Sequence, residues 1–180
     1  DEAASFLPTD PLVRESNEGH YLVAAPEDVY RRRLDDPELA HFIDLASSEA
    51  EYGLTLMKAL EDGRVRTVGI HGDTKLENFL FSATTGCVKA LIDLDTIMPH
   101  TWLADYGDMM RSLVNVAGEK EPDLDRVRVD MDIYEAVATG FFETASEVTD
   151  AEVELAVAAV EIIALELGVR FMTDYIRGDS

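Results

Sequence analysis

Two short apolar runs joined by a turn constrain the fold of this chain more than any other feature. Residues 78–81 (NFLF) and 88–92 (VKALI) flank the segment 82–87, which is small, polar and contains a glycine. Such a pattern is typical of an antiparallel hairpin. The start of the first strand of a hairpin lies beside the end of the second. We therefore expect Asn78 and Asp93 to be neighbours at one edge of a small sheet.

A polar loop, HGDTKLEN at residues 71–78, leads into this hairpin and brings Asp73 to the same edge. Clustered carboxylates raise each other's pKa values unless a cation lies among them, and Mg²⁺ suits such oxygen ligands. The spacing is that of the metal- and phosphate-binding end of a kinase active site, where one carboxylate orients the substrate hydroxyl and two groups hold magnesium. The alternative is that Asp73 and Asn78 only form turns and Asp93 only ends a strand.

The charge of the chain restricts its partners. It has 37 acidic and 15 basic residues, a formal net charge of −22 at pH 7. This charge argues against nucleic acid or an anionic membrane surface as a partner. One cysteine, Cys87, excludes an internal disulfide and a cysteine-based zinc site. No apolar run is long enough to span a membrane and no signal peptide is visible, so we expect a cytoplasmic protein.

Helical periodicity dominates the rest of the chain. We expect a short helix over residues 27–34, whose Arg31–Arg33 run forms a solvated face or, alternatively, contacts an anion. A brief strand over residues 66–70 and a loop around Pro99 are also expected. The longer predicted helices span residues 37–60, 105–116, 130–145 and 149–176, the last beginning with a Thr149–Glu152 capping box and capped by Gly178. The sequence thus predicts one α+β, mainly helical domain whose small antiparallel hairpin carries the active-site loop.

Several motifs resemble a known family. They are HGDTKLEN (71–78), IDLDTIMP (92–99), DYGDMMR (105–111) and, less specifically, RFMTDY (170–175) with the Gly-Asp pair at 178–179. They resemble the C-terminal lobe of the phosphotransferase family that includes aminoglycoside phosphotransferases and choline kinases, relatives of protein kinases. Within it, the N-acetylhexosamine 1-kinase subgroup is most similar. The resemblance implies that residues 1–180 form the catalytic and substrate-binding lobe of a protein-kinase-like fold.

The same resemblance implies a magnesium-dependent transfer of the γ-phosphate of ATP to a small-molecule hydroxyl. A sugar or amino sugar is the favoured acceptor, and an aminoglycoside, choline or homoserine remains an alternative. A non-catalytic kinase-like binding module is the alternative from another class. Upstream of the hairpin there is no Gly-rich phosphate loop and no strand lysine of the VAIK type. We therefore expect an N-terminal nucleotide-clamping lobe to be missing from this chain, which begins with Asp1, and the chain alone to be poorly active.

The resemblance also suggests roles for individual residues at the metal and the phosphate. Asp73 resembles the catalytic base. Asn78 and Asp93 resemble the residues that hold Mg²⁺ and the nucleotide, with Asp95 as a second metal or substrate contact. Lys75 lies where many kinases place a cation near the transferred phosphate, although it could be only a solvated loop lysine.

Other residues are expected around this centre. His71 and Asp105 resemble residues that support the catalytic loop. Arg170 is a candidate sugar contact, because guanidinium groups suit polar substrates, but it could equally be a structural ion-pair partner. Asp108 and Arg111 belong to the third motif or form only a surface pair one helical turn apart.

Overall fold

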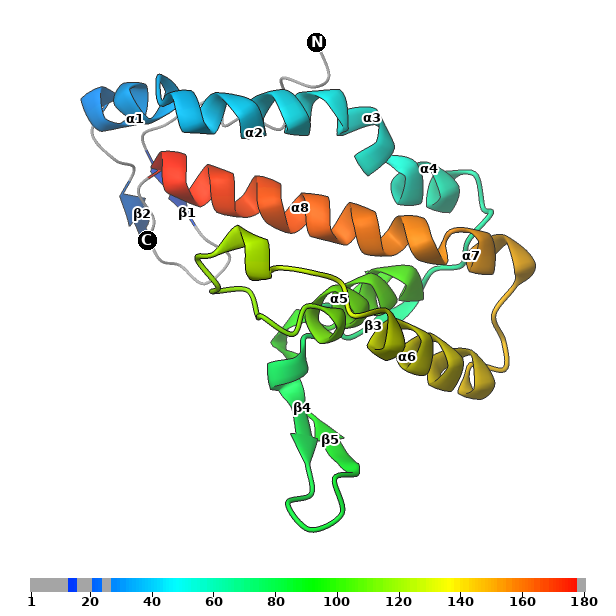
Figure 1. Cartoon of the computed structure of the whole chain (residues 1–180). Helices are drawn as coiled ribbons and strands as arrows, with labels where there is room; N and C mark the ends of the chain where they lie inside the picture. The colour runs from blue at the N-terminus through cyan, green and yellow to red at the C-terminus, as the bar shows by residue number, and fades with distance from the viewer. Residues whose placement is uncertain (1–12, 16–20, 24–26, 178–180) are drawn as a thin grey trace. The chain divides into compact units, whose positions relative to one another are not determined.

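The computed structural model describes residues 13–15, 21–23 and 27–177, and within them the protein is a mainly helical α+β structure, as predicted (Figure 1). The helices are α1 (Glu27–Leu34), α2 (Pro37–Ser48), α3 (Ala50–Gly53), α4 (Thr55–Glu61), α5 (Trp102–Val114), α6 (Met131–Thr144), α7 (Asp150–Glu154) and α8 (Ala156–Arg177). The strands are β1 (Val13–Glu15), β2 (Tyr21–Val23), β3 (Val68–Ile70), β4 (Phe79–Phe81), β5 (Val88–Leu91) and β6 (Met98–His100). Short 3-10 helices are η2 (Leu76–Asn78), η3 (Leu94–Thr96) and η4 (Leu124–Arg126). No helix among these residues is long and apolar enough to cross a membrane.

The chain divides into two compact units, residues 1–53 with 165–180 and residues 54–164. The core of the first unit lies between α2 and the C-terminal part of α8, where Leu39 packs against Met172 and Ile176. Arg33 of the basic run on α1 lies over the ring of Tyr175, 5.1 Å from its centroid, and donates to the Tyr175 carbonyl. This arginine is therefore part of a packing contact within its unit.

The single helix predicted over residues 37–60 is wrong, because α2, α3 and α4 are separate segments. The hydroxyl of Ser47 donates to the carbonyl of Ile43, and the hydroxyl of Ser48 donates to that of Leu45. Such bonds compete with the helical backbone, and a glycine follows at the end of α3. In α4 the Leu56 side chain is buried, whereas its neighbour Met57 is exposed. The predicted helix over residues 149–176 is likewise divided, into α7 and α8, and Gly178 lies outside the described residues.

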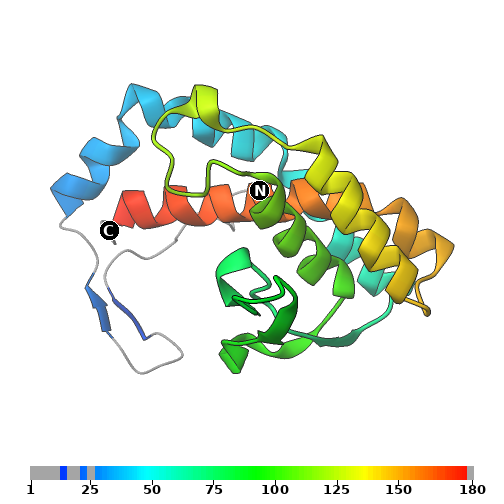
Figure 2. The same cartoon turned by 60° about the horizontal axis from the view of Figure 1, so that its bottom comes forward.

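The second unit is built around α5, which contributes the largest fully buried apolar side chains of this unit. Leu103, Tyr106 and Met110 are buried, and α6 runs beside α5, where the Trp102 ring stacks on Phe141 at 5.2 Å between ring centroids (Figure 2). The first part of α8 approaches α5 closely at Gly107. A β-carbon there would lie 2.6 Å from the Ala159 carbonyl oxygen, so only glycine fits this crossing.

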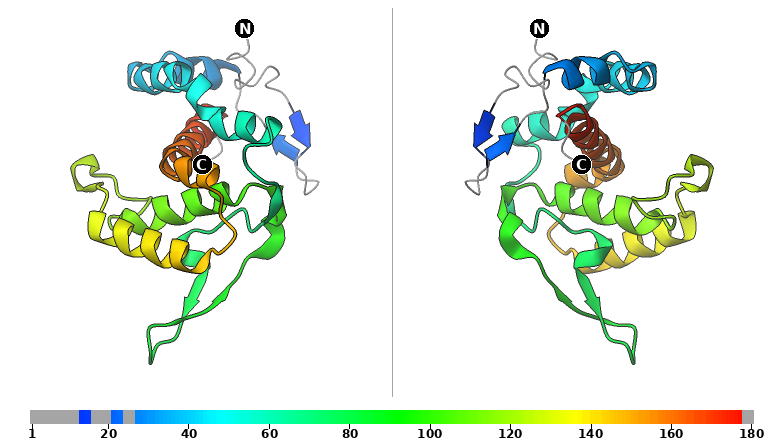
Figure 3. Two further views of the ribbon diagram at one scale, coloured as in Figure 1. Left: turned by 90° about the vertical axis from the view of Figure 1, so that its right-hand side faces the viewer. Right: turned by 90° about the vertical axis from the view of Figure 1, so that its left-hand side faces the viewer.

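Antiparallel strand pairs in this unit carry the polar loop and the hairpin. In β4 and β5, Phe79 pairs with Leu91, which confirms the predicted hairpin, and this ribbon extends away from α5 and α6 (Figure 3). The segment around Pro99, predicted as a loop, is instead the strand β6, which pairs with β3 through Val68 and His100. The loop of residues 71–75 therefore leaves a short β-ladder and enters the hairpin through η2.

The entrance to β3 is fixed by a buried carboxylate. Glu152 is fully buried, and it forms the predicted capping box with Thr149 at the start of α7. It also accepts hydrogen bonds from the backbone and side chain of Arg66, at 3.1 Å from the backbone nitrogen. Burial alone would raise the pKa of Glu152, but the bonds from Arg66 and Thr149 outweigh it and lower the pKa to about 2.

Candidate active site

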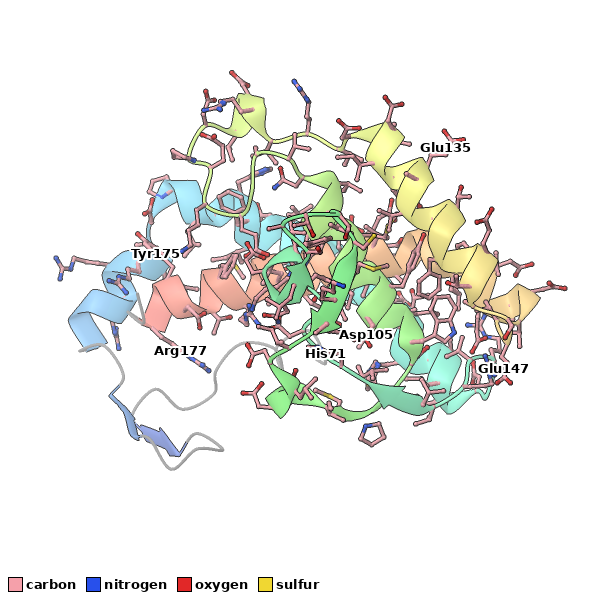
Figure 4. All side chains as sticks on the ribbon, turned by 90° about the horizontal axis from the view of Figure 1, so that it is seen from below. His71, Asp105, Glu135, Glu147, Tyr175 and Arg177 are labelled. Atoms are coloured by element: carbon pink, nitrogen blue, oxygen red, sulfur yellow. The ribbon has the colours of Figure 1, made fainter. Side chains whose placement is uncertain are left out.

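The loop of residues 71–76 is fastened to the first turns of α5. Both oxygens of the Asp105 carboxylate accept backbone hydrogen bonds, from His71 and from Gly72, each at 2.8 Å, and Figure 4 shows the labelled His71 beside Asp105. Gly72 has a φ of +83°, and a β-carbon there would lie 2.7 Å from the Thr96 carbonyl oxygen. Glycine is thus required at the turn that Asp105 holds.

The His71 ring joins this loop to the end of β5. The backbone amide of Asp73 donates to His71 Nδ1 at 3.2 Å, so Nδ1 is the unprotonated nitrogen. The proton is then on Nε2, which donates to the Ile92 carbonyl at 2.9 Å. The Thr96 hydroxyl donates to the His71 carbonyl at 2.7 Å. His71 therefore connects the loop carrying Asp73 with the residue immediately before Asp93.

The Asp73 carboxylate accepts hydrogen bonds from two side chains. Its Oδ2 accepts from Asn78 Nδ2 at 2.9 Å and from Lys75 Nζ at 2.6 Å, and the same amide nitrogen of Asn78 donates to the Asp73 carbonyl at 2.8 Å. Partial burial by itself would raise the pKa of Asp73, but the bonds from Lys75 and Asn78 reverse this effect and lower it. Asp73 is therefore a charged, oriented acceptor.

Asp93 lies in the same electrostatic environment. Its backbone is left-handed, with φ 68° and ψ 65°, at the point where β5 ends and η3 begins. The Ile92 amide donates a hydrogen bond of 3.0 Å to the Asn78 carbonyl. This bond aligns the start of the first strand with the end of the second, as expected from the hairpin pattern. The pKa of Lys75 is raised by its hydrogen bond to Asp73 and further by the charges of Asp93 and Asp108. The Lys75 ammonium is thus favoured by the charges of Asp73, Asp93 and Asp108.

The donor set fits a hard divalent cation. Because both Asn78 hydrogen bonds use its amide nitrogen, the amide oxygen points away from Asp73 and could bind a metal together with the Asp93 carboxylate. Within the described ranges, no group of three or more His, Cys, Asp or Glu side chains is placed to hold a metal, so a site here depends on the Asn78 amide. Asp95 is exposed in η3, and its contact with a second metal or substrate stays a prediction.

Arg170, the predicted sugar contact, belongs to the other unit of the chain. It is exposed on α8, and its guanidinium lies over the ring of its neighbour Phe171, 5.6 Å from the centroid. Its role in substrate binding stays a prediction.

Sequence reasoning missed two polar residues that fasten the loop to α5, Thr74 in the loop and Ser112 on the helix. The Ser112 hydroxyl accepts from the Leu76 amide at 2.9 Å, and the Thr74 hydroxyl donates to the Asp105 carbonyl at 2.6 Å. A signal was present, because Asp105, Asp108 and Ser112 share one helical face at a spacing of three and four residues.

Comparison with known families agrees with this geometry. A model of the phosphotransferase enzyme family (APH) matches residues 4–138, a span that includes the loop, the hairpin and all of α5. The chain therefore belongs to the phosphotransferase enzyme family. Membership indicates phosphotransferase activity of the kinase type, and members of this family generally use ATP and Mg²⁺.

Proposed function

We propose that this chain is the C-terminal lobe of a kinase that transfers the γ-phosphate of ATP to a small-molecule hydroxyl in the presence of Mg²⁺. A sugar or amino sugar is the favoured acceptor, as in the N-acetylhexosamine 1-kinase subgroup. The observation that supports this proposal is the Asp73 carboxylate, which Asn78 and Lys75 orient by hydrogen bonds. Asp105 fastens the loop that carries it to α5.

Asp73 is suited to the role of the base. Its Oδ2 is engaged by Lys75 and Asn78, so Oδ1 is the atom that accepts the hydrogen bond of the incoming hydroxyl. A low pKa is adequate, because a loose phosphoryl-transfer transition state requires orientation of the hydroxyl more than early deprotonation. The carboxylate takes the proton as the bond between the acceptor oxygen and the γ-phosphorus forms. At the same time the bond from that phosphorus to the β-phosphate oxygen breaks, and ADP leaves.

Asn78 and Asp93 would hold Mg²⁺, with Asp95 as a further contact, and the bound ion would neutralise charge on the phosphates. The Lys75 ammonium, which already lies among carboxylates, would contribute a positive charge beside the transferred group. The extreme negative charge of the chain makes such cations necessary for binding a nucleotide. Arg170 is proposed as a sugar contact.

An N-terminal lobe that covers the nucleotide is the proposed partner of this chain. Without it we expect weak nucleotide binding and slow turnover, because a kinase holds ATP between two lobes. An aminoglycoside, choline or homoserine is an alternative acceptor, and a non-catalytic kinase-like binding module is an alternative function.

The test is transfer of labelled γ-phosphate by the protein joined to its N-terminal lobe, measured over a panel of hexosamines, aminoglycosides, choline and homoserine. Asp73→Asn should lower kcat by about 10²–10⁴-fold, the usual contribution of a positioned base. Asp44→Asn, an equal charge change at an exposed position on α2, is the matched control. Full activity of Asp73→Asn would overturn the assignment. Calorimetric binding of Mg²⁺ and ATP without transfer to any acceptor would instead favour the binding module.

A further inference from the structure

Asp108 and Arg111 do not form the solvated surface pair that their spacing allows. The two side chains are only 12% and 11% exposed, and they are joined by a salt bridge within α5. Arg111 also pairs with Glu119 in the segment after α5. Buried ion pairs contribute little net stability, because desolvation offsets their attraction. Stability alone therefore gives little reason for a buried pair here.

The pair lies directly behind the catalytic loop. Asp105 and Ser112 hold the loop at Gly72 and at Leu76, one at each end. Between these ends, the buried Thr74 donates its hydroxyl to the Asp105 carbonyl, and the same oxygen lies 3.4 Å from Asp108 Oδ2. Asp108 thus supports the loop at its centre.

Thr74 lies between the two residues with proposed chemical roles, Asp73 and Lys75. The negative charge of Asp108 acts on both, because it repels the Asp73 carboxylate and attracts the Lys75 ammonium. A displacement of Thr74 would move both neighbours, and misplacement by about 1 Å can cost about 10²-fold in rate.

We propose that Asp108, paired with Arg111, is a positioning residue that sets the place of Asp73 and Lys75 through Thr74. This role rests on the kinase function proposed above. It extends the machinery from the loop itself to the interior of α5.

The experiment separates positioning from stability with a paired replacement in the protein joined to its N-terminal lobe. Arg111→Met leaves the Asp108 carboxylate buried without its partner and should lower Tm by roughly 10 °C. Adding Asp108→Leu removes that buried charge and should restore most of the lost Tm. The double variant should nevertheless keep a kcat about 10–100-fold below wild type, with the KM for ATP within about 2-fold.

Thr74 provides the independent arm. Thr74→Val should reproduce the loss in kcat. Thr74→Ser, which keeps the hydroxyl, should have the kcat of wild type. Arg126→Met is the matched control, because the exposed Arg126 forms a salt bridge of 3.0 Å with Glu121 in the segment after α5. A double variant that regains both Tm and kcat would show that the pair is purely structural and would overturn the proposal.

Hydrogen exchange of the amides at residues 71–76 gives a result even if wild type transfers no phosphate. Faster exchange there in the double variant, once most of the lost Tm is restored, supports the positioning role. Unchanged exchange overturns it. The kinase assignment can therefore fail without deciding the role of Asp108.

Discussion

The Asn78 amide nitrogen lies 2.9 Å from Asp73 Oδ2 and 2.8 Å from the Asp73 carbonyl oxygen. One side chain thus fixes both the proposed base and the backbone that carries it, and its remaining oxygen is the proposed metal ligand. These tasks use different atoms of one amide, so truncation of this side chain affects both.

Asn78→Ala removes the proposed metal ligand together with both hydrogen bonds to Asp73. The Mg²⁺ concentration needed for half-maximal nucleotide binding, measured by calorimetry on the protein joined to the proposed N-terminal lobe, should rise by about 10-fold or more. Asn115→Ala is the control, because its amide donates to Gly118 in a separate turn, at 3.2 Å. An unchanged magnesium dependence in Asn78→Ala would contradict the ligand role.

Local contacts were the predictable part of the site. The hairpin follows from two apolar runs and a turn, and its register places Asn78 beside the Ile92–Asp93 end because few residues separate the strands. The capping box of Thr149 and Glu152 was predictable for the same reason, since it spans one helical turn.

Contacts between distant segments could not be predicted in this way. Support of the loop by Asp105 was expected only from the resemblance to a family, and the pairing of Val68 with His100 was not expected. These residues lie far apart in sequence, and no local pattern specifies such partners. The breaks after α2 depend on serine hydroxyls that donate to backbone carbonyls instead of to water. The periodicity of apolar residues does not predict such bonds.

Gly72→Ala should destabilise the protein through a steric clash as well as through backbone strain. A β-carbon at this position would lie 2.7 Å from the Thr96 carbonyl oxygen, whereas at Gly63, with a similar φ of +69°, nothing lies within 4 Å. Gly63→Ala should cost about 1–2 kcal/mol for the left-handed backbone alone. Gly72→Ala should cost more, and urea unfolding of the two variants measures the difference. Equal losses would show that the loop can yield around Thr96.

Stability should fall in acid because of Glu152. Its pKa is about 2 in the folded protein, below the ordinary value near 4.3, so its contribution is complete above the unfolded pKa and is lost as the pH falls toward 2. The contribution is on the order of 1–2 kcal/mol, because solvent around the partly exposed Arg66 screens the pair. The difference in unfolding free energy between wild type and Glu152→Gln should therefore shrink from pH 6 to pH 2.5. The exposed Glu154→Gln should show no such trend.

Because the backbone of Asp93 is left-handed, substitutions at this position can distinguish a metal-ligand role from a structural one. At φ 68° a glycine is free of strain, aspartate and asparagine are tolerated, and alanine is penalised. Asp93→Gly should therefore match or exceed wild type in stability by up to about 1 kcal/mol, while Asp93→Ala should be less stable by about 1–2 kcal/mol. If the carboxylate binds the metal, both variants should lose magnesium-dependent nucleotide binding alike despite their opposite stabilities. Nucleotide binding that followed stability instead would make Asp93 a turn residue, because then only the conformation of the chain at this position would matter.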